Sequence, residues 1–272
     1  MMELDNDFET AVVVPQENCS NIKFYEVCRV LDEIESNSTE LSATDKLDKI
    51  FNNNLAASLV DHSTYPLVRL LIPYHDNSRG NFGIKEAKLI DIYINALSIP
   101  KEDSDYAKLI NWKHPDNVNR EDVGKLIYGV SGQRSSINKP SNKTLGDINM
   151  LLDRIVDANM ASTEKDNKDS VFRDKIINVF PPTEQKWLIR IIFAKGDDKG
   201  LKIGLKKDSI LNRLHPLAKE MHDSKCDLKG TLDGITPIGI AAASRKEDEG
   251  AITIEPLVAF SPMLSKKANT SV

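Results

Sequence analysis

The side chains whose types and spacing suit chemistry in this sequence are lysines set among glycines. The clearest example is KGDDKGLKIGLKK at residues 195–207, which holds five lysines, two aspartates and three glycines. A lysine neutralises a phosphate, and a glycine lets the main chain approach it closely. The stretch just before it, from Trp187 to Phe193, is almost wholly apolar. The pattern predicts a cationic loop that is rooted in a buried helix.

Basic residues recur at two other expected helix ends. The segments are SRGNFGIKE (78–86), with Arg79 and Lys85, and GQRSSINKPSNKT (132–144), with Arg134, Lys139 and Lys143. Each loop taken alone is more often a solvated surface loop than a binding site. Three such loops, each next to a helix start or end, favour a surface that follows phosphates. Aromatic residues are sparse in them, so stacking on single-stranded bases is not the favoured mode.

Residues that could bind a metal or form a catalytic group are scattered. His215, His222, Asp223 and Cys226 are the nearest to a cluster, but C-x-x-C or H-x₃-H spacing is absent, so a zinc site is not favoured. A metal-dependent hydrolase would need paired carboxylate and histidine motifs on facing helices, which the sequence does not offer.

One segment imitates an active site. GTLDGIT at 230–236 resembles the Lys-x-Asp-Gly-x-Arg core of enzymes that form a covalent lysine–AMP intermediate. That chemistry needs an amine nucleophile, and Thr231 occupies the nucleophile position while Thr236 occupies the arginine position. We therefore expect no catalytic residues in this chain.

Composition and charge limit the classes of protein to which this sequence can belong. The chain has 272 residues, 40% apolar and 28% charged, and no apolar run approaches the roughly 20 residues that span a bilayer. The acidic start lacks a basic segment, so a secretory signal is not expected, and three cysteines fit a reduced compartment. Net charge is −5 overall, but residues 1–50 alone carry twelve acids and four bases, which leaves the rest of the chain net positive. A local positive field is therefore compatible with an acidic total.

Apolar periodicity predicts an all-α protein. Helices are expected within FYEVCRVLDEI, DKLDKIFNNNLAASL, STYPLVRLLIP, GIKEAKLIDIYINALSIP, TLGDINMLLDRIVDANM, SVFRDKIINVF, TEQKWLIRIIF and HPLAKEMHD. Thr64 and Thr183 are expected N-caps, and Pro216 is expected at the start of the last helix. The stretch Leu89–Leu97 is apolar on nearly every side, which predicts a central helix.

Composition also suggests boundaries along the chain. We expect a flexible acidic N-terminus at 1–20, a helical body at 21–229, a mobile loop at 230–250, and a strand with a linker at 251–272. The strand is AITIEPLVAF, which alternates and contains Pro256, a residue typical of a sheet edge or bend.

Several blocks resemble one family, the eukaryotic ATP-dependent DNA ligases. The blocks are YPLVRLLIPYHDNSRGNFGIKEAKLIDIYINALSIPK, DINMLLDRI, EQKWLIRIIF with KGLKIGL, HPLAKEMHD, and EPLVAFSPMLSKK. They fall in order over roughly 20–230 and 250–267, and their detail is most similar to the end-joining branch, DNA ligase IV. Two departures are a 230–250 segment that looks like an insertion and a KGDDKG segment longer than expected.

The resemblance implies a compact multi-helix DNA-binding domain with a short β segment near the C-terminus. It implies binding of nicked or broken double-stranded DNA through backbone contacts, for ATP-dependent sealing by catalytic domains outside this chain. The process would be non-homologous end joining of double-strand breaks in the nucleus, with no membrane involved. ATP and Mg²⁺ are implied for the full-length ligase, and no cofactor is expected in this chain.

The resemblance also assigns roles to residues. The expected DNA contacts are Lys199, Lys202, Gly204, Lys206 and Lys207, with Arg79, Lys85, Arg134, Lys139 and Lys143 as secondary candidates. Arg190 is expected to be structural and paired with a carboxylate on a neighbouring helix, and Trp187 is expected to anchor the core.

An alternative is a helical module that binds proteins through its acidic N-terminal helices. The resemblance allows both functions, because end-joining ligases meet processing factors through this domain. A scaffold partner is expected to bind outside this chain, and a nuclease partner on the N-terminal helices. Charge reversal at Lys202, Lys206 and Lys207 distinguishes the two, since it should abolish DNA binding and spare a protein partner.

Overall fold

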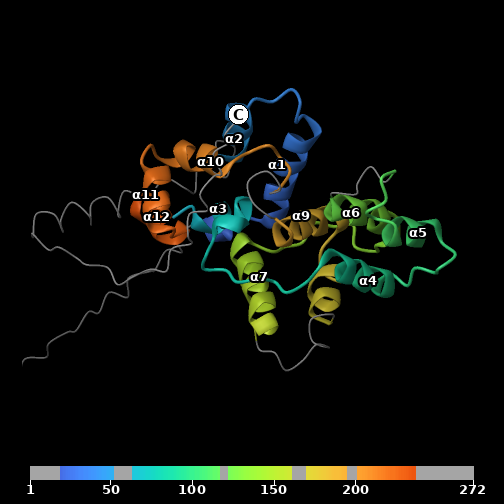
Figure 1. Ribbon diagram of the computed structural model, residues 1–272. Coiled ribbons are helices and arrows are strands. Elements are labelled where there is room, and N and C mark those ends of the chain that lie inside the picture. The colour runs from blue at the N-terminus through green and yellow to red at the C-terminus, as the bar shows by residue number, and fades with distance from the viewer. Residues whose placement is uncertain (1–18, 52–62, 117–121, 161–169, 195–200, 237–272) are drawn as a thin grey trace, which may run out of the picture.

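The computed structural model describes residues 19–51, 63–116, 122–160, 170–194 and 201–236 (Figure 1). In this part of the chain the structure is helical and holds no sheet, which confirms the predicted all-α class. The α-helices are α1 (Phe24–Ser36), α2 (Ala43–Phe51), α3 (Tyr65–Leu71), α4 (Glu86–Ala96), α5 (Ser104–Ile110), α6 (Val123–Arg134), α7 (Leu145–Met160), α9 (Pro182–Ile192), α10 (Lys207–Leu214), α11 (Ala218–Lys225) and α12 (Leu228–Gly234). Short turns are η1 (Cys19–Asn21), η2 (Pro73–His75) and the π-type η3 (Arg173–Ile177).

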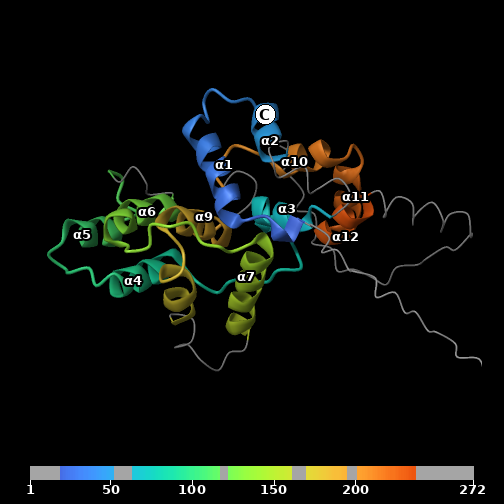
Figure 2. The same ribbon diagram turned by 180° about the vertical axis from the view of Figure 1, so that it is seen from behind.

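The helices form two groups joined through the middle of the molecule. In both views α4, α5 and α6 gather at one end and α10, α11 and α12 at the other, with α1, α3 and α9 between them (Figures 1 and 2). Helices α6 and α9 lie side by side and make the most extensive contact among the described helices. The expected DNA contacts are therefore carried by elements at both ends of the molecule.

Helix α9 is the central element of the core. Trp187, Leu188 and Ile189 are fully or almost fully buried, and Trp187 alone covers a large apolar area. The sequence predicted that Trp187 anchors the core, and it also predicted a central helix at Leu89–Leu97, which is only partly buried. Asp91 and Asn95 of α4 are exposed, so one face of α4 is in contact with solvent.

The polar side chains of α9 are buried but hydrogen-bonded, which is what makes their burial tolerable. Glu184 accepts hydrogen bonds from the main-chain N and Oγ of Ser141, at 2.8 and 2.5 Å. Gln185 accepts from the hydroxyl of Tyr93 at 2.7 Å. Lys186 and Arg190 form ion pairs with carboxylates of other helices, as described below. The helix is thereby fixed to its neighbours on every side.

Some boundaries differ from the sequence expectations. Pro181 is the N-cap of α9 and Pro182 its first residue, so Thr183 lies inside the helix. Thr64 holds the N-cap position of α3 as expected, although its side chain makes no capping hydrogen bond. Residues 230–234, expected in a mobile loop, belong to α12, because Asp227 caps that helix by accepting from the main-chain N of Gly230 at 3.0 Å. Pro216 precedes α11 by two residues.

Three further expectations concern segments that the structure does not describe. The strand expected in 251–272, the flexible N-terminus expected at 1–20 up to residue 18, and the loop from 237 onward lie outside the described residues. Within the part that the structure describes, no helix is long and apolar enough to cross a membrane.

Candidate nucleic-acid interface

Residues 201–206, which we call the LKIGLK turn, alternate between core and solvent. Leu201, Ile203 and Leu205 are buried in the apolar core, whereas Lys202, Gly204 and Lys206 are exposed. The apolar side chains anchor the segment at every second residue, so the residues between them face outward. The buried apolar residues thus fix the main chain of the turn, and the lysines between them present positive charge to the solvent.

The backbone of this turn is unusual at two positions. Lys202 has φ of 60° and Gly204 has φ of 71°, both in the left-handed region. Glycine adopts this conformation freely, whereas a lysine there costs roughly 1 kcal/mol or more. Non-glycine residues held in this region are often found at functional sites. The three buried anchors hold Lys202 in this conformation.

Lys207 differs from the two exposed lysines, although it follows them directly. Its Nζ lies 2.6 Å from Oδ1 of Asp223 in α11 and 3.8 Å from Oδ1 of Asp208. The hydrogen bond from Lys207 lowers the pKa of the Asp223 carboxyl. The positive charge of Lys207 is therefore largely neutralised by Asp223, and this ion pair holds α11 against the start of α10. The remaining expected contact of this segment, Lys199, lies outside the described residues.

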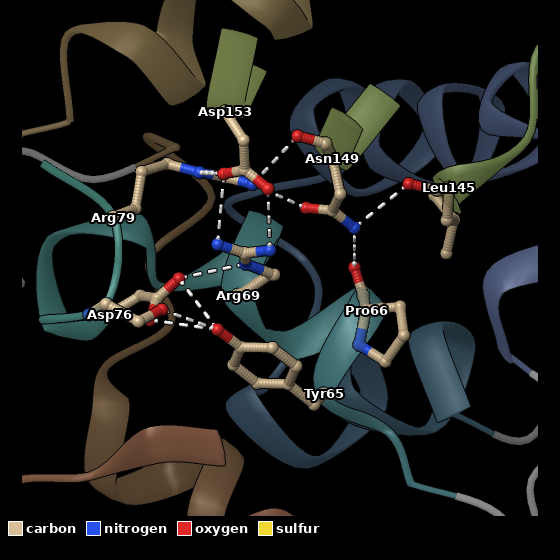
Figure 3. A network of polar contacts seen from close by, with 9 residues as sticks. Tyr65, Pro66, Arg69, Asp76, Arg79, Leu145, Asn149 and Asp153 are labelled. Atoms are coloured by element: carbon tan, nitrogen blue, oxygen red, sulfur yellow. Dashed lines mark hydrogen bonds and ion pairs between the residues drawn. The ribbon is translucent and has the colours of Figure 1, made fainter. Parts of the chain in front are cut away.

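Arg79 is placed inside the protein, which corrects its assignment as a DNA contact. Its side chain is only 2% exposed, and its Nε donates to Oδ1 of Asp153 at 2.8 Å (Figure 3). Its Nη2 donates to Oδ1 of Asn149 at 2.8 Å. Arg69 also pairs with Asp153 and, through Nε, with Asp76 at 2.9 Å. Arg79 thus joins the loop before α4 to helix α7.

The rest of that loop follows α7 closely. The main-chain O of Asn81 accepts from Nδ2 of Asn159 at 2.9 Å, and the N of Gly83 donates to Oδ1 of Asn81 at 2.8 Å. Gly83 has φ of 63°, and a Cβ there would overlap the Asn159 side chain. These contacts fix the path of the chain into α4, where Lys85 is the exposed N-cap. Lys85 therefore stays a candidate phosphate contact, whereas Arg79 supports it from inside.

The third basic loop divides in the same way. The half-buried Arg134 pairs with Asp103 and Asp105, and these ion pairs join α6 to the start of α5, so its role as a DNA contact stays a prediction. Lys139 and Lys143 are exposed. The main-chain O of Lys143 accepts from the N of Phe24 at 2.9 Å, which ties this loop to the start of α1. Lys139 and Lys143 remain candidates.

Arg190 is structural, as the sequence predicted. Its Nη2 lies 2.6 Å from Oε1 of Glu35 in α1 and 2.7 Å from Oδ2 of Asp122, the N-cap of α6. Lys186 pairs with the same Glu35 and with Asp32. These buried cations hold three helices together and are not available to a ligand.

Sequence reasoning missed one cation close to the LKIGLK turn. Lys46 of α2 is buried, and its Nζ lies 3.3 Å from the position that a Cβ on Gly204 would occupy. The two residues are 158 positions apart, and Lys46 sits in the most acidic part of the chain. The position of Lys46 in the sequence of α2 did not indicate that its side chain would lie near Gly204.

The exposed candidates do not converge on one pocket. The LKIGLK turn leads into α10, whereas the loop before α4 runs along α7, and the two are well separated in both views (Figures 1 and 2). A ligand that touches both must be extended, as the backbone of a nucleic-acid duplex is. Among the described residues, no group of three or more histidines, cysteines or carboxylates is arranged to hold a metal ion.

Comparison with known proteins identifies the class to which this helical domain belongs. Residues 23–215 match the family described as DNA ligase N terminus, and since this is most of the chain, the protein belongs to that family. Within the family it is a DNA ligase IV-like N-terminal domain, as the sequence resemblance predicted.

Individual relatives support this assignment. The chain is 31% identical over 260 residues to DNA ligase 4 of Gallus gallus and 28% identical over 260 residues to DNA ligase 4 of Homo sapiens, in each case covering 92% of this chain and 27% of the relative. It is 30% identical over 211 residues to DNA ligase 4 of Arabidopsis thaliana, covering 76% of this chain and 16% of the relative. The chain therefore spans about a quarter of the length of the vertebrate relatives it matches.

Proposed function

We propose that this chain is the DNA-binding domain of a DNA ligase IV-like enzyme that joins double-strand breaks by non-homologous end joining in the nucleus. It binds nicked or broken duplex through phosphate contacts and positions it for ATP-dependent sealing. The sealing chemistry, with ATP and Mg²⁺, belongs to catalytic domains outside this chain, and the chain alone is expected to be non-catalytic.

The observation that carries this proposal is the LKIGLK turn. Its buried anchors hold Lys202, Gly204 and Lys206 outward on a fixed main chain, with two left-handed residues. Ligation has to work at any break, so the binding must be independent of base sequence and rest on the backbone. A cationic, glycine-containing turn suits this task better than base-reading side chains. Lys85, Lys139 and Lys143 extend the proposed contact to other phosphates.

The test is a fluorescence-anisotropy titration of the chain with a nicked duplex at several salt concentrations. Each lost phosphate contact reduces the slope of log affinity against log salt by about 0.9. A Lys202→Ala/Lys206→Ala double variant should therefore lower the slope by about 1.8. Lys207→Ala, the matched control, should change it less because Asp223 already neutralises Lys207.

Two results would count against the proposal. Absence of salt-dependent binding by the wild-type chain would remove DNA binding itself. An unchanged slope in the double variant would leave DNA binding in place and remove the LKIGLK turn as its site.

The alternative, a protein-binding module on α1 and α2, is favoured less by the geometry. Asp32 and Glu35, two of the acids of α1, point inward to Lys186 and Arg190 of α9. The acidic surface of α1 is thus smaller than the sequence suggested. End-joining partners, including a nuclease on α1 and α2 and a scaffold protein outside this chain, remain part of the proposal for the whole enzyme.

A further inference from the structure

Lys46 is a buried lysine whose ammonium group has an unusual set of partners. Only 7% of the residue is exposed, and its Nζ donates to the main-chain O of Ser38 at 3.1 Å. Buried ammonium groups are normally paired with a carboxylate, because an unpaired charge is costly to remove from water. Among the described residues, no carboxylate forms an ion pair with Lys46.

The acids nearest to Lys46 in α2 are engaged elsewhere. Asp45 accepts from the N and Oγ of Ser42, at 3.1 and 2.6 Å. Asp48 pairs with Arg213 of α10 at 3.0 Å. Both acids are thus used to shape α2 and to join it to α10. Within the described part of the chain, the positive charge of Lys46 therefore has no carboxylate in ion-pair contact with it.

That charge lies directly against the LKIGLK turn. A Cβ built on Gly204 would lie 3.3 Å from Lys46 Nζ, and no other described residue beyond its two chain neighbours comes within 4 Å of that position. Among the described residues, the ammonium group of Lys46 is therefore the nearest neighbour of the space that a side chain would fill at position 204. Gly204 is exposed, so this space faces the same solvent as Lys202 and Lys206.

We propose that Lys46 is a further cation of the phosphate-binding site, and that it faces a bound DNA phosphate across the space left open at Gly204. This inference rests on the proposed function. The phosphate supplies a negative partner that none of the described residues provides to Lys46. Glycine at 204 then has two roles, since it permits the left-handed backbone and places no side chain between the ammonium group and the bound phosphate. Helix α2, which lies far from the LKIGLK turn in the sequence, thereby contributes a residue to the proposed DNA site.

The test compares charge removal at two lysines of the same helix. Lys46→Gln removes the charge and keeps a donor for the Ser38 carbonyl, and Lys46→Arg keeps the charge. Lys49→Gln is the matched control, because Lys49 lies one turn further along α2 and is already paired with Glu33. The readout is the slope of log affinity against log salt for a nicked duplex, with thermal unfolding as a check on folding.

The proposal expects Lys46→Gln to lower the slope by about 0.9, one phosphate contact, whereas Lys46→Arg and Lys49→Gln keep the wild-type slope to within about a third of that change. If Lys46→Gln does not fold, Lys46→Met keeps the apolar stem and takes its place. A folded neutral variant with the wild-type slope and affinity would overturn the role of Lys46 while leaving the proposed function intact. A wild-type chain without salt-dependent binding would overturn both.

Discussion

Two basic residues of one loop, Arg79 and Lys85, have different surroundings and therefore different expected roles. Arg79 is enclosed by Asp153 and Asn149, whereas Lys85 is exposed at the start of α4. A buried cation with fixed partners contributes to the stability of the fold. An exposed cation contributes to the field that a ligand meets.

We expect Arg79→Met to lower the free energy of unfolding by about 1–3 kcal/mol, because it removes the hydrogen bonds that the buried Arg79 guanidinium makes to Asp153 and Asn149. Lys85→Met should change it by less than about 0.5 kcal/mol and should weaken DNA binding instead. Urea denaturation measures the first effect and anisotropy the second. A stable Arg79→Met protein with a flatter salt dependence would restore Arg79 as a DNA contact.

The sequence could not separate these two residues, and the reason is physical. Both stand beside glycines before a helix, so local pattern assigns them alike. What distinguishes them is Asp153, which lies more than 70 residues further along the chain and reaches Arg79 only through the packing of α7. Lys46 was missed for the same reason. Arg190 was correctly expected to pair because its neighbours are all apolar, which is a local signal.

At the scale of elements, the closest helix packing is that of α6 against α9. Gly124 makes it possible, because a Cβ on this residue would lie 2.8 Å from the main-chain O of Lys186 and 3.1 Å from Cγ of Arg190. Gly129, in the same helix, is exposed, and no described residue outside its own helix backbone lies within 4 Å of its Cβ position. The two glycines therefore offer a matched pair.

Gly124→Ala should lower the free energy of unfolding by about 1–3 kcal/mol, because the helices must move apart to admit the methyl group. Gly129→Ala should raise it by about 0.4–1 kcal/mol, since alanine restricts the unfolded chain and favours the helix. Chemical denaturation of both variants measures the difference. Equal effects of the same sign would show that α6 and α9 are not packed as closely as described.

Several elements were predicted from the sequence and others were not. Apolar periodicity predicted α1, α2 and α7, because each buries a regular apolar stripe, whereas N-cap and proline signals helped to predict α3 and α9. Helices α5, α6 and α10 were not expected. Three glycines interrupt the pattern of α6, and α5 and α10 are too short to show a period. Helix α12 was hidden by its two glycines, although Asp227 is a typical N-cap.

At the scale of the whole molecule, one ion-pair network joins the first and middle parts of the chain. Glu35 of α1 accepts hydrogen bonds from Lys186 and Arg190 of α9, and Arg190 also reaches Asp122 of α6. Burial alone would raise the pKa of Glu35, but the hydrogen bonds from Arg190 and Lys186 outweigh it and lower the pKa to about 2. The stability of the protein at acidic pH therefore depends in part on this network.

Because the pKa of Glu35 is lower in the folded state than in the unfolded state, its contribution is complete above about pH 5 and is lost as pH falls toward 2. Glu35→Gln should lower the free energy of unfolding by about 2–3 kcal/mol at pH 7. At pH 3 the difference in the free energy of unfolding between the wild type and Glu35→Gln should be smaller by about 1–2 kcal/mol. Urea denaturation at both pH values measures this, and an equal gap at the two would contradict the assignment.

The same contact between α1 and α9 also bears on how the protein is made. Arg190 follows Glu35 by 155 residues, and the ribosome adds about 5–20 residues per second. The N-terminal helices therefore leave the ribosome about 8–30 s before their partner helix exists. During that interval the apolar face of α1, including Phe24, Leu31 and Ile34, has no α9 to pack against. The acids of residues 1–50 give the nascent segment a net negative charge, and such charge favours solubility and opposes association until α9 is made.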